Sequence, residues 1–350
     1  MAKWSESVSV VIATYNRPDT LLVAITSALA QTHPVEEVIV VGDCCNETTA
    51  DALAGLNDSR VKYINLPVRC GEQAIPNAIG VLWATSTWVA FLNHDDIWLP
   101  QHVGTLLGEM RRTRSRWAIG AGTFSYESES TADGLRPIFS DVTPPNRRIS
   151  NAFVFSLMYL EPTSSWLVRR DDLISVGNWR PAWTMRRTPT NEFALRLWRR
   201  IGEPVFVSSV TCLKILDKPE EGPRYARVSG AHAFIAERLS NSVANAWGNL
   251  GTLEAGQTRH RTAPITALWL DLPQTGLLAK LTSWFIRRPR LVASIYKCAR
   301  VDVVELLLAL RGVACGSTLT QLLTERTNEI RLGRFGVREV ARMTKIRDHV

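Results

Sequence analysis

The sequence lacks two features that would define its class at once: a C-x-x-C pair of cysteines and a long apolar run. No C-x-x-C pair of the kind that tetrahedral zinc sites use occurs among its six cysteines, which are Cys44, Cys45, Cys70, Cys212, Cys298 and Cys315. The most apolar stretch, Val303 to Leu310, contains Glu305 and is far shorter than the roughly 20 residues that cross a bilayer. We therefore expect a chain in a reducing cytosol, without a zinc site, that does not span a membrane.

Two further signals are absent near the N-terminus. The first residues, MAKWSESVSVVIA, lead straight into a strand-like run without the apolar segment of a signal peptide, so export is not expected. After that run the sequence contains neither G-x-G-x-x-G nor G-x-x-x-x-G-K-[ST], the usual loops for a dinucleotide or a triphosphate. A bound diphosphate would have to be held in another way.

What is present suffices for a large α/β core. The chain has 350 residues, 45% of them hydrophobic, which predicts one large domain plus an appendage of about a hundred residues. Short β-branched or aromatic runs predict strands, and segments with helical periodicity fill the gaps. The strands are Val8 to Ile12, Val38 to Val41, Val61 to Leu66 and Trp88 to Leu92, and the helices follow Pro18 or span Thr48 to Leu56 and Asn77 to Ala84. This order predicts a mostly parallel sheet with helices on its faces.

Polar side chains follow three of these predicted strands. Ligands of parallel sheets bind outside the carboxyl ends of the strands, so these side chains should converge on one crevice. They are Thr14, Tyr15, Asn16 and Arg17 after the first run, Asp43 after the second, and His94, Asp95 and Asp96 after the fourth.

Each group in this crevice has a functional and a structural interpretation. The ring of Tyr15 can stack on a base, and Asp43 can accept a hydrogen bond from a base N–H, but both are also common turn residues. Asp95 and Asp96 can bind Mg²⁺ or Mn²⁺, because such ions use one or two carboxylates plus substrate phosphates. The alternative is that this pair caps a helix beginning near Pro100.

Four segments occur in a defined order: VSVVIATYNRP, VVGDCCNETTADAL, NLPVRCGEQAIPNAIG and FLNHDDIWLP. Together they resemble family-2 glycosyltransferases with the GT-A fold, and EPTSSWLVRRDDLISVGNWRP and TNEFALRLWRRIG extend the likeness over about residues 5 to 215. The resemblance implies a Rossmann-like α/β domain at 1–218, with a donor half at 5–115 and an acceptor half at 116–218. A mainly helical region at 219–350 would follow it.

The resemblance also implies roles for individual residues. Asp95 matches the metal-coordinating acid of the family's D-x-D-like motif, Asp96 is a second candidate ligand, and Glu192 falls where the family carries its catalytic base. The implied nucleotide-sugar site consists of Thr14, Tyr15, Asn16, Arg17, Asp43, Asn77 and His94. An inverting transfer from a nucleotide-diphosphate sugar, UDP-linked in our expectation, to a hydroxyl of a glycan, lipid-linked or cell-envelope acceptor follows, with Mn²⁺ or Mg²⁺ as cofactor.

The sequence departs from the family pattern at three places. Asn93 replaces the first acid of the D-x-D, Gly42 and the two cysteines after Asp43 replace residues of a D-D-G-S turn, and Asn191-Glu192 replaces Glu-Asp. A helical repeat of Phe193, Ala194, Leu197, Trp198 and Ile201 places Glu192 in a first turn, where the helix dipole alone would also favour a carboxylate. These departures keep open a catalytically silent GT-A scaffold or nucleotide-sugar-binding module. A nucleotidyltransferase is a further alternative, but it would normally carry a glycine-rich loop after the first strand, which this sequence lacks.

The C-terminal third offers one further hypothesis. An apolar stripe from Leu277 to Phe285 precedes a basic cluster of Arg287, Arg288, Arg290, Lys297 and Arg300. Such a segment is typical of a helix on a membrane surface, which would place this cytoplasmic protein at the inner face of the membrane; a helix packed on the catalytic domain is the alternative. The net charge of +8 comes without a nucleic-acid-binding module, so no nucleic-acid partner is expected.

Overall fold

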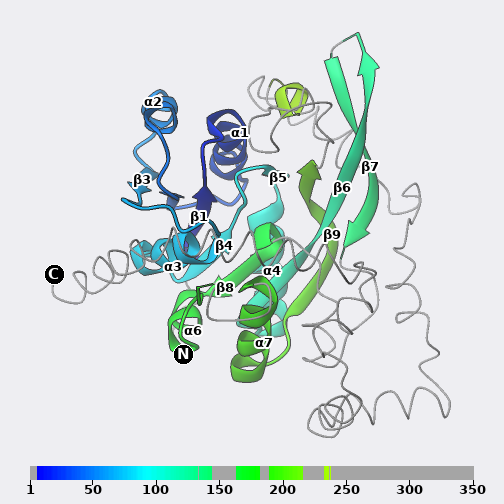
Figure 1. Ribbon diagram of the computed structural model, residues 1–350. Coiled ribbons are helices and arrows are strands. Elements are labelled where there is room, and N and C mark those ends of the chain that lie inside the picture. Colours follow the sequence, from blue (N-terminus) through cyan, green and yellow to red (C-terminus); the bar gives the residue numbers. More distant parts are fainter. Residues whose placement is uncertain are drawn as a thin grey trace, which may run out of the picture.

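The structure, a computed structural model, describes residues 6–132, 134–143, 163–181, 189–215, 232–235 and 237. Its strands form one nine-stranded sheet in the order β3-β2-β1-β4-β8-β6-β9-β5, with β7 paired to β6 (Figure 1). The strands are β1 Val8–Thr14, β2 Glu37–Gly42, β3 Val61–Asn65, β4 Trp88–Phe91, β5 Asp96–Trp98, β6 Trp117–Thr131, β7 Gly134–Thr143, β8 Trp166–Arg169 and β9 Val205–Ile215. The helices are α1 Pro18–Leu29, α2 Glu47–Ala54, α3 Ala74–Trp83, α4 His102–Thr113, α6 Arg170–Ser175 and α7 Pro189–Ile201, with a short 3₁₀ turn at Thr163–Ser165.

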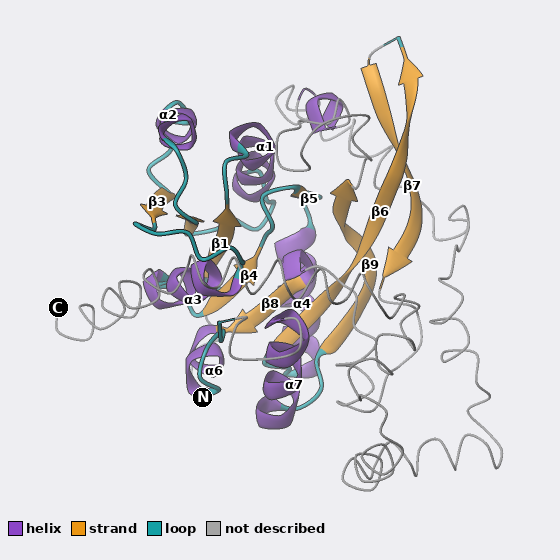
Figure 2. Ribbon diagram, viewed as in Figure 1, coloured by secondary structure: helices purple, strands orange, loops and turns teal. Residues whose placement is uncertain are grey.

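The sheet has a parallel half and a mixed half. Strand β1 pairs in parallel with both β2 and β4, and β2 pairs in parallel with β3. Beyond β4 the sheet continues through antiparallel β8, and β6 then runs parallel to β9. The long strands β6 and β7 form an antiparallel pair that extends past the rest of the sheet (Figure 2). The prediction of an α/β fold with helices flanking the sheet is confirmed, and the four strands that the sequence predicted are those of the parallel half.

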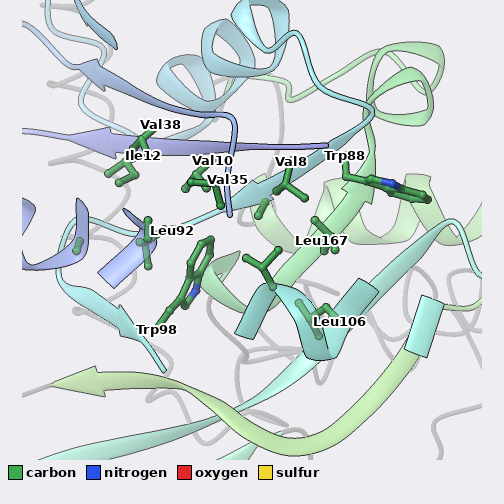
Figure 3. Close-up of a cluster of buried hydrophobic side chains, with 14 of the residues drawn as sticks. Val8, Val10, Ile12, Val35, Val38, Trp88, Leu92, Trp98, Leu106 and Leu167 are labelled. Carbon is green, nitrogen blue, oxygen red and sulfur yellow. The ribbon is translucent and has the colours of Figure 1, made fainter. Parts of the chain in front are cut away.

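The two faces of the sheet carry separate apolar clusters because successive side chains of a strand point to opposite sides. Val11 and Val41 belong to the cluster that includes buried residues of α3 and α7. Val10 and Ile12 belong to the other, which includes residues of α1 and α4 and appears in Figure 3. Strand β1 is therefore buried on both faces, and its carboxyl end is held rigidly at the edge of the sheet.

Helix α3 begins three residues before the predicted start at Asn77, and the reason lies in its first turn. The carboxylate of Glu72 accepts hydrogen bonds from the main-chain N–H groups of Ala74, at 2.7 Å, and Ile75, at 3.3 Å. Pro76 then fits the first turn because no intrahelical bond is lost there. Further along, Gly80 packs against Val11, and any side chain at this position would collide with it.

Much of the predicted C-terminal region lies outside the described residues. Only 232–235 and 237 of the range 219–350 are described, so the apolar stripe from Leu277 and the basic cluster after it cannot be placed. The boundary at 218 and the helical nature of this region stay predictions. Within the described parts of the chain, no helix is long and apolar enough to cross a membrane.

Candidate active site

The carboxyl ends of β1, β2 and β4 meet around Thr14, the last residue of β1. The main-chain N–H of Asp43 donates to the carbonyl oxygen of Thr14 at 2.8 Å. The Thr14 hydroxyl lies 3.1 Å from Nδ1 of His94. Because Thr14 is only 3% exposed, these contacts fix the three strand ends to each other. The structure thus brings the three predicted groups of polar residues to one edge of the sheet.

On one side of Thr14, the carboxylate of Asp43 is met by main-chain donors. Its Oδ1 accepts from the N–H of Cys70 at 2.5 Å, and its Oδ2 accepts from the N–H of Gly71 at 2.8 Å. Gly71 has a φ of 72°, a left-handed conformation that glycine adopts without strain. Burial raises the pKa of Asp43, and the two N–H groups and Arg69 oppose that rise. The carboxylate therefore anchors the loop that leads into α3.

The same loop brings a cation to Tyr15. The guanidinium carbon of Arg69 lies 4.1 Å from the centre of the Tyr15 ring, which is the geometry of a cation–π contact. Beside it, Asn16 has a φ of 47°, and its side-chain oxygen accepts from the N–H of Asn46 at 2.9 Å. Tyr15, Asn16 and Asp43 are therefore adjacent, as the hypothesis of a base-binding pocket requires. Arg69 was not predicted, and its exposed position in a loop gave no signal in the sequence.

On the other side of Thr14, Asp95 is paired with side-chain cations. Its Oδ2 lies 3.0 Å from a guanidinium nitrogen of Arg17, and its Oδ1 lies 3.9 Å from Nζ of Lys214. Burial raises the pKa of Asp95, but the neighbouring groups, Lys214 foremost, outweigh burial, and the pKa falls below its ordinary value. The lowered pKa keeps the carboxylate ionised, and the side chain remains 25% exposed.

Asp96 is the first residue of β5 and is completely buried. Its Oδ1 accepts from Nζ of Lys214 at 2.8 Å. Its Oδ2 accepts from the hydroxyl of Ser164 at 2.5 Å and from Nδ2 of Asn93 at 2.8 Å. Burial raises the pKa of Asp96, and Lys214 opposes that rise. The alternative that the acidic pair caps a helix is wrong, because α4 begins six residues later and has no side-chain cap.

Two histidines lie beside this acidic pair. Burial lowers the pKa of His94 to about 4, so the ring is neutral at physiological pH. The ring of His232, which is 2% exposed, places Nε2 at 3.0 Å from the carbonyl oxygen of Asp95. Burial also lowers the pKa of His232. His232 was not predicted, because it lies beyond the region of family resemblance.

Glu192 lies in the first turn of α7, as its helical periodicity predicts. Its Oε1 accepts from Nε of Arg196 at 2.7 Å and lies 3.4 Å from a guanidinium nitrogen of Arg180. Its Oε2 is buried and has no hydrogen-bond partner among the described residues. At the same end of α7, the hydroxyl of Thr190 accepts from Nε2 of Gln73, at 3.2 Å, so this end of the helix contacts the residue preceding α3.

The remaining candidate, Asn77, is buried in α3 at 3% exposure, and its main-chain N–H bonds to the carbonyl oxygen of Gln73. Its predicted contact with the donor stays a prediction. Lys214 was also missed, although it stands among the mostly apolar residues of the segment VTCLKI. A lysine that is mostly buried must find a partner for its charge, and here that partner is Asp96.

Comparison with known proteins shows the family to which the chain belongs. Residues 9–177 match the model of the family described as Glycosyl transferase family 2. The uncharacterized glycosyltransferase alr2836 of Nostoc sp. strain PCC 7120 is 36% identical over 251 residues, which cover 70% of this chain and 71% of the relative. The chain belongs to glycosyl transferase family 2.

More distant proteins show similarity over different shares of their length. The UDP-Glc:alpha-D-GlcNAc-diphosphoundecaprenol beta-1,3-glucosyltransferase WfgD of Escherichia coli is 25% identical over 185 residues, or 49% of this chain and 73% of the relative. The solved structure of S. aureus TarS 1-349 in complex with UDP-GlcNAc has a TM-score of 0.47 and 14% identity, with 88% of each chain covered. Two further curated relatives are matched over only 28% and 37% of their own lengths.

Proposed function

We propose that this protein is an inverting glycosyltransferase that uses a nucleotide-diphosphate sugar, UDP-linked, and transfers the sugar to a hydroxyl group. The observation that carries the proposal is the convergence at one sheet edge of Asp43 beside Tyr15 and of Asp95 among cations, in a member of family 2. In this arrangement the base lies on the Asp43 side and the diphosphate on the Asp95 side. Thr14, Asn16, Asn77 and His94 complete the proposed donor site.

A divalent cation, Mn²⁺ or Mg²⁺, fits Asp95. The cation needs one or two carboxylate oxygens, and phosphate and water supply the rest of its shell. Asp95 offers an ionised carboxylate with a quarter of its surface exposed, which suits this role. Asp96 is the second predicted ligand, although all its contacts are already made inside the protein. When bound, the metal would offset negative charge on the leaving diphosphate.

Glu192 is the proposed general base. Arg196 fixes Oε1 through a 2.7 Å hydrogen bond, and Oε2, which is buried without a partner among the described residues, is the proposed proton acceptor. The acceptor hydroxyl would lose its proton to Oε2 while its oxygen attacks the anomeric carbon from the face opposite the diphosphate. The bond from the anomeric carbon to the diphosphate oxygen breaks, and the configuration at that carbon inverts. A positioned base of this kind contributes about 10²- to 10⁴-fold in rate.

The acceptor in this proposal is a glycan, a lipid-linked sugar or another cell-envelope molecule. The name of the relative WfgD, which describes a transfer from UDP-Glc to a sugar on diphosphoundecaprenol, supports this class. An acceptor of that type would suit a cytoplasmic enzyme at the inner face of the membrane. The basic C-terminal segment proposed for membrane contact lies outside the described residues.

The proposal is tested first by a thermal-shift screen of nucleotide-diphosphate sugars with and without Mn²⁺. We expect a UDP-sugar to raise the melting temperature most, and to do so more strongly with the metal. Transfer or hydrolysis of that sugar then separates the enzyme from the catalytically silent alternative. Binding without any turnover would support the silent module, and no binding of any donor would contradict both.

The base assignment is tested by Glu192→Gln. The variant should bind the donor as the native protein does but turn over about 10²- to 10⁴-fold more slowly, because an amide cannot accept the proton. Glu109→Gln is a matched control, since Glu109 is also a helical glutamate paired with an arginine, Arg112, at 2.8 Å. Undiminished turnover in Glu192→Gln would refute the assignment.

A further inference from the structure

Lys214 is a cation that the proposed mechanism does not yet use. It lies on β9 and belongs to the wall of the donor site because its Nζ is 2.8 Å from Asp96 and 3.9 Å from Asp95. A charged ammonium in such a place costs desolvation energy, which its pairing with Asp96 offsets. The side chain is 19% exposed, so Lys214 is not sealed inside the core as Asp96 is.

Asp96 is engaged in a different way from Asp95. It has no exposed surface, and hydrogen bonds from Lys214, Ser164 and Asn93 occupy both of its oxygens. A metal ligand must present an oxygen to a site that substrate phosphates and water can enter. Asp95 meets that condition with a quarter of its side chain exposed, whereas Asp96 does not.

The ammonium of Lys214 retains donors for another group. An ammonium has three N–H donors, and among the described residues Nζ of Lys214 makes one hydrogen bond, to Asp96. The distance of 3.9 Å to Asp95 is too long for a hydrogen bond but close enough for charge attraction. A diphosphate bound beside Asp95 would therefore find a second, fixed cation next to it.

We propose that Lys214 is a diphosphate-binding residue of the donor site, and that Asp96 is a positioning residue that holds it there instead of a metal ligand. This inference rests on the proposed function. It specifies which charge on the protein acts on the leaving group in addition to the metal at Asp95. Ser164 and Asn93 then act on Lys214 indirectly, because they fix the carboxylate of Asp96 that orients it.

The test compares ligands that differ by one phosphate. Isothermal titration calorimetry with Mg²⁺ would measure the affinities for UDP and UMP, or for the matching pair of whichever nucleotide the native protein binds best. The double variant Asp96→Asn/Lys214→Met removes both charges together, so no buried charge is left unpaired. We expect UDP to bind about 10- to 100-fold more weakly, the value of a lost charge-assisted hydrogen bond, and UMP affinity to change much less.

Three further single variants make the result specific to Lys214. Lys62→Met is a matched control, because Lys62 also pairs with a buried acid, Glu37, at 2.6 Å, but lies on β3; it should leave both affinities unchanged. Asp96→Asn alone should retain the affinity for Mn²⁺ in the presence of UDP, measured by electron paramagnetic resonance of free Mn²⁺. If the double variant does not fold, Lys214→Gln provides the same UDP-to-UMP comparison while keeping a hydrogen bond to Asp96.

Three results are distinguishable. A native protein that binds no nucleoside diphosphate would contradict the proposed function itself. A native protein that binds UDP, with the same UDP-to-UMP ratio in the Lys214 variants, would overturn the role of Lys214. A loss of Mn²⁺ affinity in Asp96→Asn would show that Asp96 is a metal ligand and would overturn its positioning role.

Discussion

Asp43 and the acidic pair Asp95 and Asp96 lie at the same sheet edge, yet their charges are met by different kinds of groups. Asp43 is held by the main-chain N–H groups of Cys70 and Gly71, whose positions the backbone fixes. Asp95 is held by side-chain cations, at 3.0 Å and 3.9 Å. Main-chain donors cannot leave their acceptor without moving the loop, whereas a side-chain ion pair can exchange partners. The difference suits a rigid base pocket beside a diphosphate site whose charges are rearranged when ligand binds.

The largest expected effect is on the Asp95 side, where side-chain ion pairs can exchange partners. Asp95→Asn should weaken binding of a nucleoside diphosphate in Mn²⁺ by about 100-fold, because Asp95 is the accessible carboxylate of the acidic pair and the metal would lose it. The remaining affinity should no longer depend on the metal. Calorimetry with and without Mn²⁺ measures both effects. Metal-dependent binding that survives in this variant would contradict the role of Asp95.

On the Asp43 side, where main-chain donors hold the carboxylate, Asp43→Asn should lower the stability of the protein. An asparagine keeps one acceptor oxygen, so one of the two buried N–H groups loses its partner at a cost of about 1–3 kcal/mol. Urea denaturation would measure this change, and metal dependence of ligand binding should persist. Asp171→Asn is the control, since its pair with Arg169 is exposed and should contribute little. Equal stability of the Asp43 variant and the native protein would show that the carboxylate does not anchor the loop.

The Asp43 side and the Asp95 side should also differ in their response to acid, because the buried ring of His94 lies beside the acidic pair. Its pKa of about 4 in the folded protein is below the ordinary 6.5, so protons bind preferentially to the unfolded chain. The contribution of the neutral His94 ring to the free energy of unfolding is complete above about pH 6.5 and is lost as pH falls towards 4. Across that window His94→Gln should reduce the slope of the free energy of unfolding against pH by about 1.4 kcal/mol per unit. An unchanged slope would contradict the buried, neutral state of the ring.

The smallest effect is expected at Arg69. Its cation–π contact with Tyr15 is exposed, so Arg69→Ala should lower the free energy of unfolding by only about 0.5–1 kcal/mol. Arg69→Lys should restore part of the loss. Thermal denaturation of the two variants measures the difference, and a loss as large as that of Asp43→Asn would show that Arg69 also holds the loop.

The sequence predicted the groups that follow the parallel strands, because local alternation and chain order are enough to place Thr14, Asp43 and Asp95 at one edge. It did not predict Lys214, which pairs with Asp96 across 118 residues of sequence. That contact depends on the antiparallel pairing of β5 with β9, and no local pattern specifies which distant strands become neighbours. Arg69 and His232 gave no local signal either, and their contacts with Tyr15 and Asp95 likewise join distant segments of the chain.

Crystals soaked with Mn²⁺ and UDP would test the central claim most directly, with the metal located by its anomalous scattering. The expected result is a manganese ion bound to the carboxylate of Asp95 and to the diphosphate, with the base beside Tyr15 and hydrogen-bonded to Asp43. Manganese and nucleotide bound elsewhere on the protein, with these side chains in contact with neither, would contradict it.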